Sequence, residues 1–140
     1  MTVKWTDPPT RSSNIAGTTL NSIGNGTTSA FVTYDNSGNR DLYAAIVVKL
    51  GSITPSAGGS ITLHVFSTDD VDTPDATGSL GGGDTYTLPL LGGAGAKVVV
   101  FPMVRLYPFS LRLQVSNDSG TSFAASGNEI YVTPYNEGLV

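Results

Sequence analysis

The stretch Phe109-Ser110-Leu111-Arg112-Leu113-Gln114-Val115-Ser116 alternates apolar and polar side chains without a break. Because successive side chains of a β-strand point to opposite faces, the alternation predicts a strand with one buried and one solvated face. A turn sequence, Asn117-Asp118-Ser119-Gly120, follows it directly. Strands of this kind form antiparallel sheets that pack on one side only.

Similar segments, each bounded by Gly, Pro, Asn, Asp or Ser, occur along most of the chain. They are 29–34, 41–50, 60–68, 84–91, 97–107 and 129–134, with a short extended piece at 122–125. Regularly spaced short strands without helical periodicity are typical of β-sandwiches. We therefore predict an all-β fold, an antiparallel β-sandwich of seven or eight strands, and we expect jelly-roll topology.

Composition agrees with one domain of this class and limits its partners. The chain has 140 residues, of which 39% are hydrophobic and only 13% charged. This is enough apolar material for a core, and no run is long enough to cross a membrane. The seven Lys and Arg residues are scattered and the net charge is −4, which predicts no nucleic-acid partner. Cysteine is absent, which excludes disulfides and zinc–cysteine sites.

The first 28 residues differ from the rest of the chain. Asp7-Pro8-Pro9 favours an extended path, and mostly polar residues and glycines follow as far as Thr28. We expect residues 1–28 to be an extended N-terminal arm and 29–140 to be the β-sandwich domain. The arm is either a frayed terminus or a segment that docks on its own domain or on a neighbouring subunit. Its opening residues show no hydrophobic region of a secretory signal peptide.

Two segments are apolar on both faces. In 41–50 the odd positions Tyr43 and Val47 are apolar in addition to the even ones. In 97–107 we assign Val98, Val100, Val104 and Leu106 to one face and Val99, Phe101 and Met103 to the other. Pro102 interrupts the second set, which indicates an edge strand or a bulge.

A second apolar face has to be covered, because in water it is an aggregation hazard. Either the acidic loop or the arm of the same chain covers it, or another subunit does. We predict a subunit interface, and therefore a homo-oligomer, with five contact residues. They are Tyr43, Val47, Val99, Phe101 and Met103.

Catalytic patterns are absent from the sequence. His64 is the only histidine, it lies in a predicted strand, and there is no G-x-S-x-G sequence for a nucleophilic serine. Carboxylates concentrate in turns and in the C-terminal tail, and their spacing shows no glycosidase pair. We predict that the protein is not an enzyme and has no cofactor.

Two binding hypotheses remain open. The segment 69–75, Asp-Asp-Val-Asp-Thr-Pro-Asp, is either a solvated acidic loop or a weak cation site, although Pro74 breaks the EF-hand pattern. Tyr43, Tyr86, Tyr107 and Tyr131 are candidates for an aromatic platform that binds a glycan, although core or interface packing explains them equally well. A carbohydrate-binding module is therefore the alternative function.

Three sequences resemble small virion proteins of tailed bacteriophages. They are Arg40-Asp41-Leu42-Tyr43-Ala44, Gly58-Gly59-Ser60-Ile61-Thr62-Leu63, and 125–137, Ala-Ser-Gly-Asn-Glu-Ile-Tyr-Val-Thr-Pro-Tyr-Asn-Glu. In particular, residues 30 to 140 look like capsid decoration (cement) proteins of jelly-roll type. The resemblance is one of texture and includes no catalytic signature.

This resemblance implies a non-enzymatic protein that is made in the host cytoplasm and sits on the capsid surface of the virion. It implies a trimer whose partner is the major capsid protein and which clamps neighbouring capsomers. Neither nucleic acid nor a membrane is an expected partner.

Overall fold

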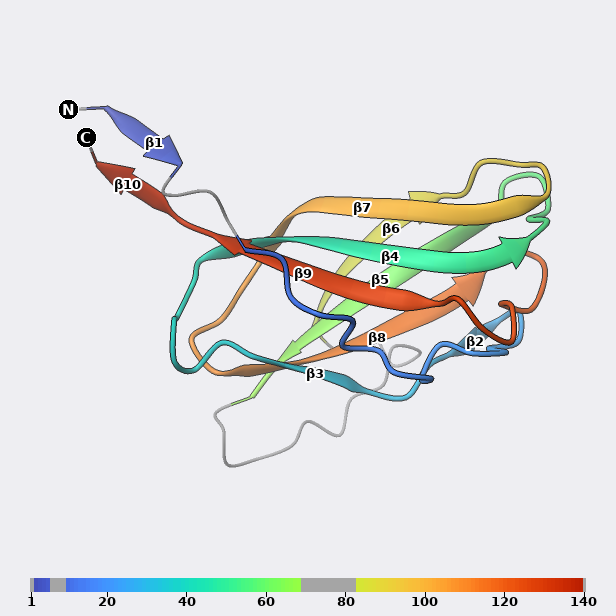
Figure 1. Cartoon of the computed structure of the whole chain (residues 1–140), viewed down its shortest axis with the longest axis horizontal. Coiled ribbons are helices and arrows are strands. Elements are labelled where there is room, and N and C mark those ends of the chain that lie inside the picture. The colour runs from blue at the N-terminus through green and yellow to red at the C-terminus, as the bar shows by residue number, and fades with distance from the viewer. Residues whose placement is uncertain (1, 6–9, 69–82, 140) are drawn as a thin grey trace.

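Two antiparallel sheets face each other and enclose one hydrophobic core (Figure 1). The structure is a computed structural model and describes residues 2–5, 10–68 and 83–139. The larger sheet contains β2 (Thr27–Thr28), β3 (Val32–Asp35), β5 (Ser60–Ser67), β6 (Asp84–Pro89) and β8 (Ser110–Asp118). The smaller sheet has the order β7 (Gly95–Arg105), β4 (Tyr43–Ile53), β9 (Glu129–Tyr135).

The strand pairs are nested along the chain. β5 pairs with β6, β4 with β7 and β3 with β8, so these six strands form one long hairpin that folds over on itself. Pairing of β5 with β8 then closes the larger sheet. This wrapped hairpin is the connectivity of a jelly roll, so the predicted all-β antiparallel sandwich is confirmed. Eight strands of the described residues build the sandwich, and β1 and β10 lie outside it.

The alternation read from the sequence places the core between the sheets. On β8 the side chains of Leu111, Leu113 and Val115 are buried against the opposite sheet. The facing side chains are those of β4, and they are Ala44, Ile46, Val48 and Leu50. Burial of each Val, Leu or Ile side chain among them stabilises the fold by about 1.5–3 kcal/mol.

A β-bulge on β7 corrects the face assignment made from the sequence. Between Ile46 and Ala44, which are two residues apart, β7 advances three residues, from Phe101 to Val104. The extra residue shifts the alternation by one position. Val104 and Leu106 are therefore buried on the same side as Val99 and Phe101, whereas Val98 and Val100 point outward. Pro102 lies in this irregular step, on a strand that is also the edge of its sheet.

Residues 10–28 pack on the sandwich of their own chain. The Ser12 amide donates to the Val132 carbonyl at 2.8 Å, and the Ile15 amide donates to the Ile130 carbonyl at 3.0 Å, so the segment follows the free edge of β9. Leu20 is fully buried in the core. Of the two alternatives for these residues, the structure therefore shows docking on the chain's own domain.

The extended piece expected at 122–125 is irregular rather than a strand. Its Phe123 is nevertheless buried in the core, and the Phe123 amide donates to the Ile23 carbonyl at 2.9 Å. The segment therefore contributes to the docking of residues 10–28 instead of extending a sheet.

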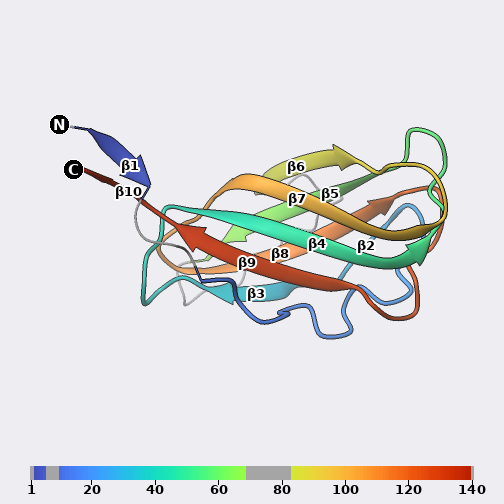
Figure 2. The same cartoon turned by 45° about the horizontal axis from the view of Figure 1, so that its top comes forward.

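The two ends of the chain form a separate two-stranded ribbon. β1 (Val3–Trp5) pairs antiparallel with β10 (Glu137–Leu139), and the pair extends from one end of the sandwich (Figures 1 and 2). We call this pair the terminal ribbon. Over the described part of the chain, no helix is long and apolar enough to cross a membrane.

Candidate interaction surface

The outer side of the smaller sheet carries an exposed apolar surface. Val98, Val100 and Met103 of β7 are 61%, 47% and 54% exposed. Beside them lie the half-buried Tyr43, Ala45 and Val47 of β4. These six residues are called the β7 face below. Val47 is directly paired with Val100, so the apolar surface is continuous from one strand to the next.

Charged residues border the β7 face at both ends of the sheet. Lys49 is paired with Val98 on one side and with Glu129 on the other. At the opposite end, Arg105 is paired with Tyr43. An apolar centre with a charged border is the usual arrangement of a protein–protein contact surface.

The N-terminal segment covers the neighbouring part of the same sheet. The Arg11 guanidinium lies over the ring of Tyr131, with its central carbon 3.4 Å from the ring centroid. Hydrogen bonding to Glu129 raises the pKa of Tyr131 above its ordinary value, because the phenol donates to that carboxylate. The arm therefore covers β9, and it leaves Val98 and Val100 exposed.

The five predicted interface residues occupy two different environments. Tyr43, Val47 and Met103 lie on the β7 face, at its half-buried or exposed positions. Val99 and Phe101 point away from the β7 face and belong to the hydrophobic core, where they are 6% and 2% exposed. The sequence predicts these two instead of Val98 and Val100 because strict alternation of side chains does not include the bulge at Pro102.

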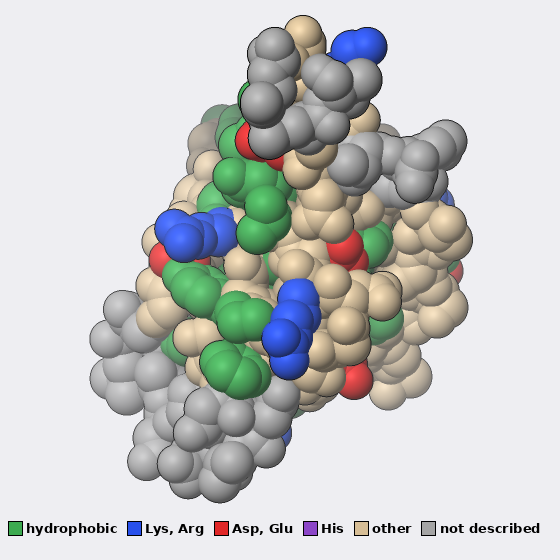
Figure 3. Space-filling model, turned by 90° about the vertical axis from the view of Figure 1, so that its left-hand side faces the viewer, with side chains coloured by type: hydrophobic (Ala, Val, Ile, Leu, Met, Phe, Trp, Pro, Cys, Tyr) green, Lys and Arg blue, Asp and Glu red, His purple; other side chains and the backbone are tan. Residues whose placement is uncertain are grey.

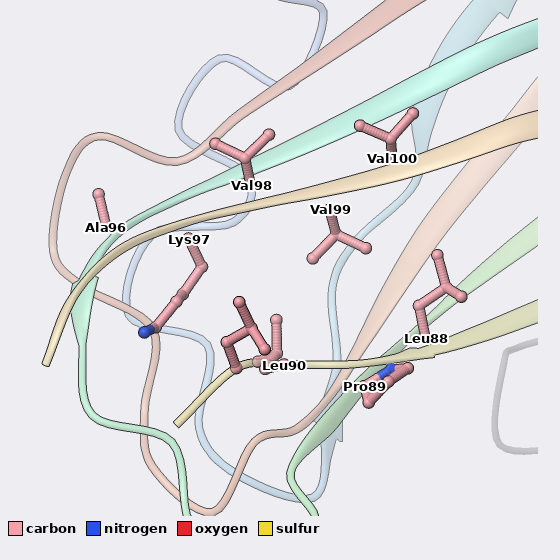
Figure 4. Close-up of a pocket in the computed structure, with 9 residues that line it drawn as sticks. Leu88, Pro89, Leu90, Ala96, Lys97, Val98, Val99 and Val100 are labelled. Atoms are coloured by element: carbon pink, nitrogen blue, oxygen red, sulfur yellow. The ribbon is translucent and has the colours of Figure 1, made fainter. Parts of the chain in front are cut away.

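A groove runs along the side of the sandwich where β6 and β7, the edge strands of the two sheets, face each other. A cavity of about 400 Å³ lies in it near the turn between the two strands, lined by Leu88, Leu90 and Val99 with other residues of both strands (Figure 4). Figure 4 shows Lys97 and Val99 extending from β7 toward β6, whereas Val98 and Val100 point to the other side. A second hollow of about 290 Å³ lies further along the same strands, beside Met103. Together they are called the β6–β7 groove.

Two tyrosines close the groove at the end nearer the terminal ribbon. The Arg105 amide donates to the Tyr86 hydroxyl at 3.3 Å, and the Tyr107 hydroxyl donates to Asp84 Oδ2 at 2.8 Å. This second hydrogen bond raises the pKa of Tyr107. The groove is consequently bridged at one end and open toward the β6–β7 turn.

A row of aromatic rings connects the terminal ribbon to the sandwich. Trp5 packs edge-to-face on Tyr135 with ring centroids 5.1 Å apart, and Tyr135 stacks on Tyr43 at 5.7 Å. Trp5 remains 59% exposed. Figure 3 looks onto this end of the molecule and shows hydrophobic side chains gathered in a band with Lys and Arg side chains beside it. Trp5 was not among the site residues predicted from the sequence. A single tryptophan in a mostly polar segment is the feature that could have indicated it.

The four tyrosines proposed as a glycan platform do not form one surface. Tyr86 and Tyr107 bridge the groove, whereas Tyr43 and Tyr131 belong to the outer side of the smaller sheet. The ring of Tyr131 is occupied by Arg11. An aromatic surface open to a ligand is instead found at Trp5.

His64 forms a hydrogen bond with a serine, but the pair lacks the third member of a catalytic triad. Nε2 of His64 lies 2.8 Å from Ser116 Oγ. Nδ1 is buried and has no hydrogen-bond partner, whereas a triad places a carboxylate there. Burial lowers the pKa of His64 below its ordinary value, against the smaller opposing effect of Asp118.

Metal ligands are not clustered in the part of the chain that the structure describes: no three His, Cys, Asp or Glu side chains come together there. The acidic segment 69–75, for which a cation site is one alternative, lies outside the described residues.

Comparison with known proteins finds only distant structural similarity. No family model matches the chain, and no curated protein matches it in sequence. Among solved structures, a ruminal GH26 endo-β-1,4-mannanase is 13% identical with a TM-score of 0.39, over 98% of this chain and 27% of that one. A rhamnosidase from Klebsiella oxytoca is 15% identical with a TM-score of 0.39, over 89% of this chain and 23% of that one. The chain thus spans about a quarter of the length of these two enzymes.

Two virus structures are similar over most of both chains. That of Cocksfoot mottle virus is 11% identical with a TM-score of 0.37, covering 84% of this chain and 78% of that one. That of tobacco necrosis virus is 11% identical with a TM-score of 0.33, covering 94% and 96%. At these identities and TM-scores the similarities assign neither a family nor a function.

Proposed function

We propose that the protein is a non-enzymatic structural subunit that works by assembling with copies of itself through the β7 face. The observation that carries this proposal is the continuous exposed apolar surface formed by Val98, Val100 and Met103 with the paired residues of β4. It lies on an edge strand, where Pro102 and the charged Lys97 and Arg105 limit uncontrolled strand addition.

The energetic argument depends on how much apolar surface a partner removes from water. Full burial of a side chain such as Val or Met is worth about 1.5–3 kcal/mol relative to full exposure. About half of the side chain is still exposed at Val98, Val100 and Met103, and every subunit of the assembly contributes these three residues. Burying the whole face therefore contributes several kcal/mol to association. This is more than a single exposed valine contributes, and it supports a contact between subunits.

In its specific form, the proposal is a capsid decoration protein of a tailed bacteriophage, acting as a trimer on the virion surface. Its support is the resemblance of 40–44, 58–63 and 125–137 to that family. In the structure, 40–44 leads into β4, the strand beside β7, and 125–137 contains β9, the next strand of the same sheet. In this mechanism the subunits bury surface against one another and against the major capsid protein. The shell is stabilised because the subunits bind its assembled form.

The oligomeric state tests the assembly proposal. We expect wild-type protein to sediment as an oligomer at micromolar concentration, and Val100→Lys to weaken association at least tenfold because it buries a charge in an apolar contact. Thr33→Lys on β3 is the matched control, since Thr33 is also an exposed strand residue but lies on the other sheet. A wild-type monomer at all concentrations up to about 100 μM contradicts the proposal, because such an affinity is too weak for a stable subunit contact.

Uptake onto phage shells that lack their decoration protein tests the specific form. We expect saturable binding at micromolar concentration and an increase in the temperature at which the shell opens. An oligomer that does not bind such shells leaves the assembly proposal standing and removes the decoration role.

Carbohydrate binding is a second candidate, favoured by the exposed ring of Trp5. A hollow beside that ring is lined by Val3, Lys4 and Glu137, so an apolar surface and hydrogen-bonding groups are adjacent. On a glycan array, binding that is lost in Trp5→Ala and retained in Tyr86→Ala supports this candidate. An array with no binding to wild-type protein rejects it.

A further inference from the structure

We propose that the terminal ribbon of one copy docks its Val3–Trp5 side in the β6–β7 groove of a second copy. The inference rests on the proposed function, because it adds a second contact between copies to the assembly formed through the β7 face. It makes the contact head-to-tail, with different surfaces on the two sides.

The terminal ribbon exposes large apolar side chains and has few contacts that hold it in place among the described residues. A two-stranded ribbon without a third strand or a packed face is only marginally stable in water. Val3 and Trp5 are each 59% exposed, and Trp5 packs edge-to-face on Tyr135. Val3 and Trp5 alternate with Lys4, so they share one side of the ribbon. Among the described residues, that side is a largely exposed apolar surface that carries an aromatic ring.

The β6–β7 groove offers a complementary surface. Its walls are two edge strands, whose outward backbone groups have no strand partner in the described residues. Its lining is apolar at Leu88, Leu90 and Val99, and Leu91 at its mouth is 84% exposed. A buried aromatic side chain in such a pocket is the usual centre of a protein–protein contact.

The two surfaces lie at opposite ends of the molecule. The ribbon extends from one end, and the open part of the groove is next to the β6–β7 turn at the other end (Figures 1 and 2). A chain therefore cannot insert its own ribbon into its own groove. A second copy is the occupant that presents both surfaces, and repetition of the contact gives a ring when the rotation closes and a filament when it does not.

Charge at the two surfaces is complementary. Glu137 is the cross-strand partner of Trp5 on the ribbon, and it is exposed. Lys97 lies in the groove, where its ammonium donates to the Gly93 carbonyl at 2.7 Å. A ribbon seated with Trp5 in the groove brings a carboxylate to this ammonium, which has no acidic partner among the described residues. Attraction between such border charges sets the orientation of the contact.

Engineered cysteines test the contact directly, because the natural chain contains none. We expect the double variant Val3→Cys/Leu91→Cys to form a ladder of disulfide-linked multimers in a redox buffer, since every copy carries both halves of the contact. The ladder ends at the ring size when the assembly is closed. Val3→Cys/Asn39→Cys is the matched control, with the second cysteine at an exposed turn residue outside the groove.

Two further variants use the affinity of the unlinked protein. We expect Trp5→Ala to weaken association about 30-fold, the effect of losing a central aromatic residue, and Lys4→Ala on the other side of the ribbon to change it little. Glu137→Lys and Lys97→Glu each weaken association, and a mixture of the two forms the mixed contact preferentially. Thermal melting confirms that each variant is folded.

The outcomes separate this inference from the proposed function. An oligomer that shows no ladder above the control and is unaffected by Trp5→Ala overturns ribbon docking, while assembly through the β7 face stands. A ladder together with loss of affinity in Trp5→Ala supports ribbon docking. A protein that is monomeric at every concentration removes both.

Discussion

Nε2 of His64 on β5 lies 2.8 Å from Ser116 Oγ on β8, and this hydroxyl lies 2.7 Å from Thr28 Oγ1 on β2. One row of hydrogen bonds thus connects three strands of the larger sheet, including the short strand that ends the N-terminal segment. The other imidazole nitrogen of His64, Nδ1, is buried without a partner.

This arrangement predicts that the folded protein is less stable in mild acid. The ordinary pKa of histidine is 6.5, and burial lowers the pKa of His64 in the folded state. As the pH falls through 6.5, the unfolded chain binds the proton more readily than the folded one, so the free energy of unfolding decreases. The decrease continues until the pH falls below the folded-state pKa. Urea unfolding at a series of pH values between 7.5 and 5 measures it.

His64→Gln is the control for this pH dependence, because it keeps a polar group but does not titrate. We expect the curve of unfolding free energy against pH to be flatter for the variant over this range. Equal slopes in the variant and the wild-type protein contradict the assignment to His64.

A second prediction concerns the N-terminal segment as part of the fold. Leu20 is 0% exposed, whereas Leu91 is 84% exposed, so the same substitution has different consequences at the two positions. We expect Leu20→Ala to lower the free energy of unfolding by about 2–5 kcal/mol through lost burial and a cavity. Leu91→Ala should leave it within about 0.5 kcal/mol. Denaturant unfolding of the two variants checks this, and a small effect of Leu20→Ala contradicts the packed segment.

Alternation of side chains predicted the strands whose faces differ most in polarity. The core positions of β8 and β5 follow their sequence patterns, because Leu113 and Leu63 are buried as the alternation predicts. The other face is not uniformly solvated, since Gln114 and His64 are buried as well. The sandwich class followed from the number and spacing of such strands. The outer face of β7 could not be assigned in the same way, since one additional residue at Pro102 moves Val104 to the core face and leaves Val100 outside.

The position of the N-terminal segment depended on long-range contacts that a local pattern does not contain. Leu20 lies in a mostly polar stretch and is nevertheless buried, and the neighbouring Asn21 is hydrogen-bonded to Asn128, 107 residues away. Pairing of β1 with β10 joins the two ends of the chain, and nothing within either end specifies the other. For the same reason Trp5 was an isolated residue in the sequence and becomes part of an aromatic row in the structure.

A third prediction concerns the buried side chain of Asn128, which connects β4 with two other segments of the chain. Its Oδ1 accepts from the Gly51 amide at 3.0 Å, and its Nδ2 donates to the Ala124 carbonyl at 2.7 Å and to Asn21 Oδ1 at 2.9 Å. Asn128→Asp keeps the acceptor for the Gly51 amide, but it replaces the amide nitrogen by a carboxylate oxygen that faces the Ala124 carbonyl and Asn21 Oδ1. We expect a loss of about 3 kcal/mol or more in unfolding free energy at pH 7, measured by urea unfolding. Asn39→Asp in an exposed turn is the matched control and should have little effect.

Substitutions at two glycines with the same backbone angle distinguish the cost of backbone strain from the cost of a steric clash. Gly120 and Gly93 both have φ of +86°, in the left-handed region that side chains disfavour. A Cβ at Gly93 meets no atom within 4 Å, whereas a Cβ at Gly120 collides with Ser56 Oγ. The Ser56 amide is held by the Ser119 carbonyl at 2.8 Å, so Ser56 cannot move away without breaking a hydrogen bond.

We therefore expect Gly93→Ala to lower the free energy of unfolding by about 1–2 kcal/mol, the cost of the left-handed conformation alone. Gly120→Ala should cost at least about 1 kcal/mol more, because it adds the displacement of Ser56 to the same backbone strain. Urea unfolding of the two variants side by side gives this difference. The double variant Gly120→Ala/Ser56→Gly should recover part of the additional loss, since it removes the atoms that collide. Equal effects of the two single substitutions contradict the close approach of the loops at Ser56 and Gly120.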